Sequence, residues 1–260
     1  QIKSTVFCYI NLDNDNTKYL RWKLLKQVVE LFKKEMMDLL IPIPEKERNQ
    51  NMVLVITEQV LSEKHGPTKI VFDRCKILIE EMRKKVLLVN TAEILSQVGS
   101  IPYYSQEKGN YFEEYLTKEE LDWKGTKIPY FQCENNMPNI NELRVLLQMV
   151  RNIKPGLVVT VGGSGVLINL IDTIIPVLCI GLGPFELETT MVTCQTLSRS
   201  LKEKDKKLLA RIGKDEQSVI QSIFTSSLQP QRIKVTRTEL GLPEDKFIIV
   251  IVGYRLDTDI

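Results

Sequence analysis

Residues 157–181 read LVVTVGGSGVLINLIDTIIPVLCIG, and this stretch decides the fold class. The run LVVTV is typical of a buried strand, and Gly162-Gly163-Ser164-Gly165 follows it as a turn. An apolar helical stretch and a second apolar run, IIPVLCIG, come next. Strand, turn, helix and strand in this order predict two parallel strands joined by a helix that crosses one face of a sheet.

The same alternation extends upstream of this stretch. Buried strands are expected in MVLVITE, VLLVN and KIPYFQC, and helices in residues 65–85 and 139–154. Pro67 suits the first turn of the former helix; Asn141 is expected to cap the latter, and Pro155 to end it. We therefore predict an α/β fold with a Rossmann-like parallel sheet and helices on both faces. A small helix is expected around TKEELDW, within a long excursion of the chain.

An amphipathic helix is predicted ahead of the sheet, in TKYLRWKLLKQVVELFKKEMMDLL. Lysines surround an apolar stripe of helical spacing that consists of Leu25, Val28, Val29, Phe32, Met36, Leu39 and Leu40. Two interpretations are open: a helix on an anionic membrane surface, or a helix docked on its own or a neighbouring domain. Glu30 and Glu35 interrupt the basic face and favour docking.

Three regions follow from these patterns. The polar, proline-containing stretch IPIPEKERNQN predicts a linker, so residues 1–48 form a helical extension and residues 49–235 the Rossmann-like domain. The stretch RTELGLPEDKFIIVIVG is expected to form a short helix, a turn and a buried strand. We accordingly expect residues 236–260 to start a second α/β domain that is truncated after Ile260.

Composition narrows the class of protein. Hydrophobic residues make up 43% of the 260 residues and charged residues 26%, which is typical of a globular chain. The net charge of +2 and the lack of a dense basic stripe give no indication of nucleic-acid binding. The five cysteines lack metal-ligand spacing, so we expect buried free thiols and no metal. Neither a secretory signal nor a run of about 20 apolar residues is found, and a cytoplasmic location is expected.

The candidate site lies where strands end. Gly162, Gly163 and Ser164 allow close approach of a ligand, and the N–H groups that open the next helix at Val166 suit a phosphate or carboxylate. Tight packing of strand and helix would explain the same glycines. The sequence matches neither the dinucleotide fingerprint nor a P-loop.

A second candidate loop, SEKHGPTKI, follows the first strand of the sheet and holds the only histidine, His65. Carboxyl ends of parallel strands meet at one edge, so this loop, with Gly66 and Thr68, is expected beside the glycine turn. His65 is a candidate general base or a group that holds a hydroxyl or phosphate; a polar surface residue is the alternative. The sequence offers no set of nucleophile, base and orienting residue.

Three segments together resemble glycosyltransferases of the two-Rossmann (GT-B) architecture. MVLVITEQVLSEKHGPTKIVFDRCKIL with VLLVN is similar to the start of the acceptor-side domain, and IKPGLVVTVGGSGVLINLIDTIIPVL to the glycine-rich segment beside the interdomain cleft. TELGLPEDKFIIVIVGYRLDTDI resembles the linker and first strand of the donor-side domain. Arg255 matches an arginine that faces the sugar-nucleotide diphosphate, although Tyr254 displaces it from Gly253.

This resemblance implies a nucleotide-sugar donor, no metal, and an acceptor that is a saccharide, a lipid-linked molecule or a protein. It implies that Gly162, Gly163, Ser164, Gly66 and Thr68 line the acceptor side. The paired glutamates of many retaining members are absent, so this chain by itself is expected to be inactive. A noncatalytic partner subunit of a transferase and a sugar-nucleotide epimerase are the alternatives, and the basic N-terminal helix is a possible contact with a membrane or a protein.

Overall fold

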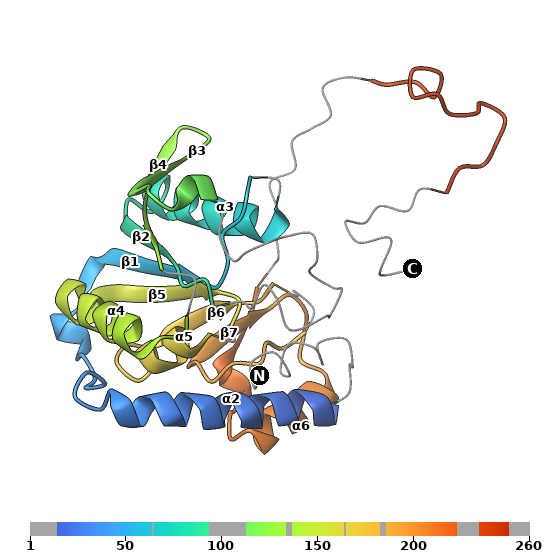
Figure 1. The fold of residues 1–260 in the computed structure, drawn as a ribbon. Helices are drawn as coiled ribbons and strands as arrows, with labels where there is room; N and C mark the ends of the chain where they lie inside the picture. The colour runs from blue at the N-terminus through green and yellow to red at the C-terminus, as the bar shows by residue number, and fades with distance from the viewer. Residues whose placement is uncertain are drawn as a thin grey trace.

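The centre of the fold is an eight-stranded sheet in the order β3-β4-β2-β1-β5-β6-β7-β8 (Figure 1). The structure, a computed structural model, describes residues 15–63, 65–93, 113–133, 137–163, 165–182, 186–222 and 234–249. The strands are β1 (Asn49–Thr57), β2 (Lys85–Asn90), β3 (Glu120–Trp123), β4 (Thr126–Gln132), β5 (Pro155–Val161), β6 (Val177–Ile180), β7 (Cys194–Leu197) and β8 (Val219–Gln221). All neighbours are parallel except the antiparallel pair β3 and β4. The parallel run β4-β2-β1-β5-β6-β7 has the strand order of the Rossmann fold, so the predicted fold class is confirmed.

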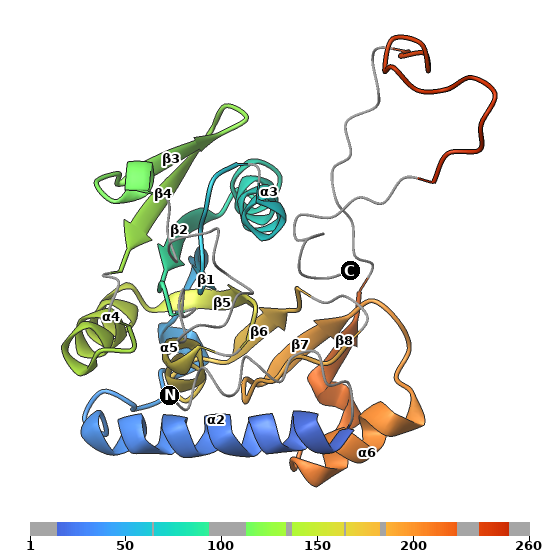
Figure 2. The same ribbon diagram turned by 45° about the vertical axis from the view of Figure 1, so that its right-hand side comes forward.

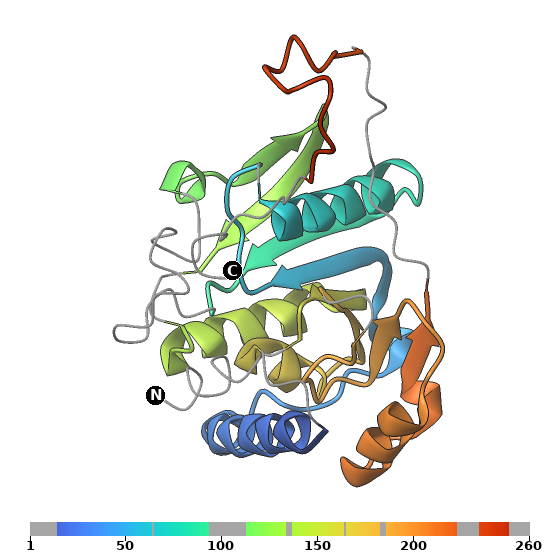
Figure 3. The same ribbon diagram turned by 90° about the vertical axis from the view of Figure 1, so that its right-hand side faces the viewer.

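Helices cover both faces of the sheet because the strands are apolar on both sides. In β1, Val53 and Val55 pack toward α3 (Gly66–Glu80), whereas Leu54 and Ile56 pack into the core on the opposite face. That opposite face is covered by α2 (Asp15–Glu35), α4 (Ile140–Ile153) and α5 (Val166–Ile171). Figure 3 shows α3 on one side of the sheet and these helices on the other. The helix α6 (Glu203–Arg211) lies beside α2.

The N-terminal helix is docked on the sheet domain. Leu25, Val29, Met36 and Leu39 belong to the same buried core as residues of α4 and α5. The helix also contacts α5 and α6 along its length (Figure 2). The docked alternative is therefore correct, and the apolar stripe cannot face a membrane while the helix stays docked.

The limits of α4 have a local cause. The Asn139 side chain caps the helix, because its Oδ1 accepts hydrogen bonds from the N–H groups of Asn141 at 3.0 Å and Glu142 at 3.2 Å. The cap is thus Asn139 and not Asn141. At the other end Lys154 takes a left-handed conformation with φ 45°, and the helix ends before Pro155 as expected. The strand β5 begins at Pro155, two residues earlier than the expected apolar run.

The small helix expected around residues 117–123 is a β-hairpin instead. Lys124 and Gly125 both have positive φ, 51° and 82°, and form the two-residue turn between β3 and β4. The Gly125 N–H donates to Asp122 Oδ1 at 3.0 Å. Burial alternates along β3, and Trp123 packs on the Phe72 ring of α3 with centroids 5.4 Å apart. Side-chain burial against α3 outweighs the helix propensity of the glutamates and lysines in this segment.

The segment 234–249 also differs from expectation. It forms a single turn at 237–241 and contains neither the expected short helix nor the start of the expected strand. Phe247 is 90% exposed and Ile249 is 77% exposed. Strand backbone needs a neighbouring strand for its hydrogen bonds, and no described strand pairs with residues 247–249. Across the described parts of the chain, no helix is long and apolar enough to cross a bilayer.

Candidate functional site

The candidate site lies at the carboxyl ends of β1 and β5. These strands are parallel neighbours, with Thr57 opposite Val161 at their ends. From β1 the chain crosses one face of the sheet through α3, and from β5 it crosses the other face through α5 (Figure 1). Loops that leave neighbouring strands in opposite directions mark the topological switch point, where ligands of such sheets bind. The structure therefore brings the His65 loop and the glycine turn to the same edge.

The glycine turn is held by packing. Gly162 has φ +84°, and a Cβ on Gly163 would lie 2.9 Å from Thr190 Cβ and 3.1 Å from Cys179 Sγ. Asn169 braces the turn, since its Nδ2 donates to the Gly165 carbonyl at 2.6 Å and its Oδ1 accepts from the Met191 N–H at 2.8 Å. Close packing thus explains the absence of a side chain at Gly163. Ser164, which the sequence places in the same turn, lies outside the described residues.

The N-terminus of α5, the helix that follows the glycine turn, is capped by a carboxylate of the protein. Glu93, fully buried just beyond β2, accepts hydrogen bonds from Val166 N at 2.5 Å and Leu167 N at 3.1 Å. A carboxylate in this position satisfies the first N–H groups and the positive end of the helix dipole. The prediction that these N–H groups face a ligand is therefore wrong. The position of Glu93 shortly after the buried strand β2 was the available sequence signal. The sequence did not show that its partner would be the N-terminus of α5.

Glu58 lies beside this carboxylate. It follows β1 and is buried, and a Cβ on Gly165 would lie 3.3 Å from both Glu58 Cγ and Glu93 Oε2. A side chain at Gly165 would press on both glutamates. Two buried carboxylates, Glu58 and Glu93, therefore lie against Gly165.

His65 is anchored at the start of α3. Its Nδ1 lies 2.9 Å from Thr68 Oγ1, which also accepts a hydrogen bond from the Leu61 N–H at 2.9 Å. Thr68 is fully buried, so its hydroxyl fixes the loop and the imidazole, and it is not exposed to a ligand as predicted. His65 itself is half-buried.

The hydrogen bond between Thr68 and His65 couples the direction of the Thr68 hydroxyl to the tautomer of the imidazole. The hydroxyl has one proton; where it donates that proton to Nδ1, Nε2 carries the ring proton and acts as a donor. Where Nδ1–H donates to the hydroxyl, Nε2 is the unprotonated nitrogen of the ring and has the lone pair of a base. The geometry accommodates both tautomers.

The start of α3 differs from the start of α5. The His65 side chain makes no capping hydrogen bond, and the first turn contains no acidic residue. A Cβ on Gly66 would meet no atom within 4 Å, so packing does not explain this glycine. Gly66 therefore has open space where a Cβ would lie, at the positive end of a 15-residue helix.

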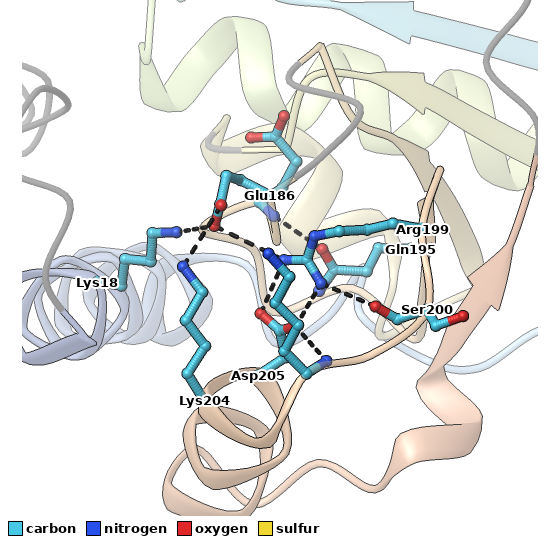
Figure 4. Close-up of polar contacts among 9 residues, drawn as sticks. Lys18, Glu186, Gln195, Arg199, Ser200, Lys204 and Asp205 are labelled. Atoms are coloured by element: carbon cyan, nitrogen blue, oxygen red, sulfur yellow. Dashed lines mark hydrogen bonds and ion pairs between the residues drawn. The ribbon is translucent and has the colours of Figure 1, made fainter.

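A cluster of charges holds the neighbouring loops on the β6 and β7 side. Figure 4 shows Lys18 and Lys204 directed at Glu186, and Arg199 paired with Asp205. Arg199 is bidentate: its Nη1 lies 2.5 Å from Asp205 Oδ2, and its Nη2 lies 3.1 Å from Asp205 Oδ1. These contacts tie α2, α6 and the loops after β6 and β7 together.

Asp205 is buried and ionised in this cluster. Burial raises its pKa, but the hydrogen bonds from Arg199 and from the Lys202 N–H outweigh burial, and the net pKa lies below the ordinary value. The charge is therefore retained because it is paired. Nothing in the sequence spacing identified this pair.

The remaining candidate residues are located as follows. Arg255 lies outside the described residues. Cys75, Cys133 and Cys179 are buried free thiols as expected, and burial raises the pKa of Cys75 to about 12. Cys194 is also a free thiol, but it is only half-buried. Cys8 also falls outside the described part of the chain. In the residues that are described, His, Cys, Asp and Glu side chains form no group of three that could hold a metal ion. Comparison of the chain with family models, curated proteins and solved structures gives no match.

Proposed function

We propose that the chain is the acceptor-side domain of a GT-B glycosyltransferase, which transfers a sugar from a nucleotide sugar to a hydroxyl group. The Rossmann strand order and the convergence of two loops at the switch point support the proposal. A fold of this kind serves many activities, so the fold alone does not single out this one. The reaction class, transfer of a sugar from a nucleotide sugar, comes from the resemblance of three sequence segments to GT-B glycosyltransferases.

The proposal rests on the N-terminus of α3, where Gly66 leaves space and the first turn has no acidic residue. Gly66 faces open space directly beside His65, and no side chain of the first turn neutralises the helix dipole. A diphosphate or a polar acceptor fits such a helix start. The ligand site is therefore assigned to His65 and Gly66, at the edge of the sheet where Gly162 and Gly163 also lie.

The proposed step uses one base and one cation. The acceptor oxygen attacks the anomeric carbon, its proton passes to His65 Nε2, and the bond from carbon to diphosphate oxygen breaks with its electron pair on the diphosphate. Arg255 neutralises the leaving diphosphate. In a retaining reaction a separate base is not required, and His65 would instead shape the pocket.

Substitution of His65 tests this role. We expect His65→Ala to lower turnover about a hundredfold or more if His65 is the general base. Thr68→Ser is the matched control, because it keeps the hydroxyl that contacts Nδ1. Assays use this chain and, where the encoded protein continues, the longer chain with its second domain. Near-normal turnover of His65→Ala would remove His65 from the mechanism.

A second candidate, a noncatalytic partner of a transferase, is favoured by one observation. Thr190 and Cys179 pack where a Cβ of Gly163 would lie, and Glu93 caps the helix after the turn, so Gly163 and the helix start are held without a ligand. Calorimetry with uridine, guanosine and thymidine diphosphate sugars separates the two candidates. Binding by the longer chain supports the transferase, and no binding by either chain supports the partner protein.

A further inference from the structure

The side of α2 that faces away from the sheet exposes apolar residues. Leu20 is 53% exposed and Leu31 is 59% exposed, although Val29 on the inner side is fully buried. Leu20 and Leu31 are eleven residues apart, which is about three helical turns, so they lie on one ridge. Lys23 and Lys34 are also eleven residues apart and exposed, and they form a second ridge next to it. We call Leu20, Lys23, Lys26, Leu31 and Lys34 the outer face of α2.

The lysines of this face carry charges that no carboxylate of the described residues neutralises through an ion pair. Among the described residues Lys23, Lys26 and Lys34 form no ion pair, and Lys26 lies over the Trp22 ring, 5.2 Å from its centroid. The nearby acids are largely matched: Glu30 bonds Lys33 at 2.9 Å, and Asp38 is held by Arg144 through two hydrogen bonds. Glu35 is a further exposed carboxylate of the helix. The outer face therefore carries surplus positive charge.

The helix α6 adds to this charge. Arg211 stacks on the ring of Tyr19 at 3.6 Å from its centroid and bonds Asn16 at 3.3 Å, so this face of α6 adjoins the first turns of α2. Lys207 lies one turn earlier on the same face and is exposed. Glu203 is the exposed acid of this helix. Figures 2 and 3 show α2 and α6 together on the side of the sheet opposite α3.

We infer that the outer face of α2 binds the surface of a bilayer that contains anionic phospholipids. Exposed leucines on a helix that lies flat can enter the headgroup region, and lysines beside them attract anionic headgroups. The leucines are separated by polar residues and do not form the continuous apolar core of a protein interface. This inference goes beyond the proposed transferase activity and does not depend on it. It also uses the opposite side of the helix from the apolar stripe seen in the sequence.

Vesicle sedimentation tests the inference. The 260-residue chain is mixed with vesicles of phosphatidylcholine containing about one third phosphatidylglycerol, and separately with pure phosphatidylcholine. We expect binding to the anionic vesicles only, weakened by added salt. Lys23→Gln with Lys34→Gln should weaken the partition about thirtyfold, and Leu20→Ser with Leu31→Ser about tenfold or more.

The matched control is Met82→Ser with Lys85→Gln, which changes an exposed apolar residue and an exposed lysine on the α3 side. It should bind like the unmodified chain, and all variants should keep the same circular dichroism and melting temperature. No binding to anionic vesicles, equal binding to both vesicle types, or an equal loss in the control would overturn the inference. Self-association that the leucine variant abolishes, without vesicle binding, would also overturn it and identify a protein interface.

Discussion

Glu93 and Val166 are joined by a buried hydrogen bond, with Glu93 Oε2 2.5 Å from the Val166 N–H. The contact links the loop after β2 to the helix after β5 across the end of β1, which lies between these strands. It places a carboxylate of the protein where an anionic ligand was expected. The open start of α3 is consequently the better candidate for ligand contact.

Loss of this carboxylate should destabilise the fold. Glu93→Ala leaves the N–H groups of Val166 and Leu167 buried without their acceptor, so we expect a loss of about 2–4 kcal/mol in the free energy of unfolding. Glu93→Gln keeps one acceptor and should lose less. Urea denaturation measures both, with Glu81→Gln on the surface as the control, expected within about 0.5 kcal/mol. Equal stability of Glu93→Ala and the unmodified chain would show that Glu93 does not cap α5.

The two candidate glycines should respond differently to alanine. Gly163→Ala forces a Cβ to 2.9 Å from Thr190 Cβ and should cost about 1–3 kcal/mol of unfolding free energy. Gly66→Ala meets no atom and replaces a helical glycine, so we expect stability unchanged or raised by up to about 1 kcal/mol. Thermal or urea unfolding of the two variants gives the comparison. A reversed order would contradict the packing assigned to the turn.

Adjacent methionines test the packing of the segment that follows α2. Met36 is fully buried and Met37 is 73% exposed, although the two side chains are chemically identical. Met36→Ala should lower the free energy of unfolding by about 2–5 kcal/mol, and Met37→Ala by no more than about 0.5 kcal/mol. Similar small effects of both substitutions would mean that the segment after α2 is not packed in the core.

The pair Arg199 and Asp205 should make stability depend on pH. Asp205→Asn leaves Arg199 without its buried counter-charge, and we expect a loss of about 3 kcal/mol near neutral pH. The pKa of Asp205 is lowered from 3.8, so its contribution is fully present above pH 3.8. It is lost as the pH falls below that value through the pKa of the folded state. Urea titrations between neutral and acidic pH should show the gap between the two proteins closing only at acidic pH; a constant gap would contradict this assignment.

Much of the fold could be predicted because apolar runs and turn residues in the sequence determine where its strands and helices lie. The apolar runs of β1, β2, β4, β5 and β6 and the turn signals between them were sufficient for a parallel sheet with helices on both faces. Short polar strands were missed: β7 reads CQTL, and its pairing with β6 depends on tertiary contacts. The hairpin at Lys124-Gly125 had a usable turn signal, but the charged residues before it favoured a helix.

The site was predictable in position but not in its contacts. Strand polarity alone places the His65 loop and the Gly162–Gly165 turn at one edge. The capping of α5 by Glu93 depends on the order β2-β1-β5, which no local pattern contains. Burial of the Thr68 hydroxyl likewise depends on how the loop at Leu61 folds back on α3.

Calorimetric titration of nucleoside diphosphate sugars into the unmodified protein and Gly66→Ala measures whether the N-terminus of α3 binds a nucleotide sugar. The experiment uses the longest chain that the gene encodes, and melting temperatures confirm that both proteins are folded. We expect binding of one sugar nucleotide, weakened about tenfold or more in Gly66→Ala because a methyl group then occupies the open helix start. Equal binding by both proteins, or no binding by either, would contradict this expectation.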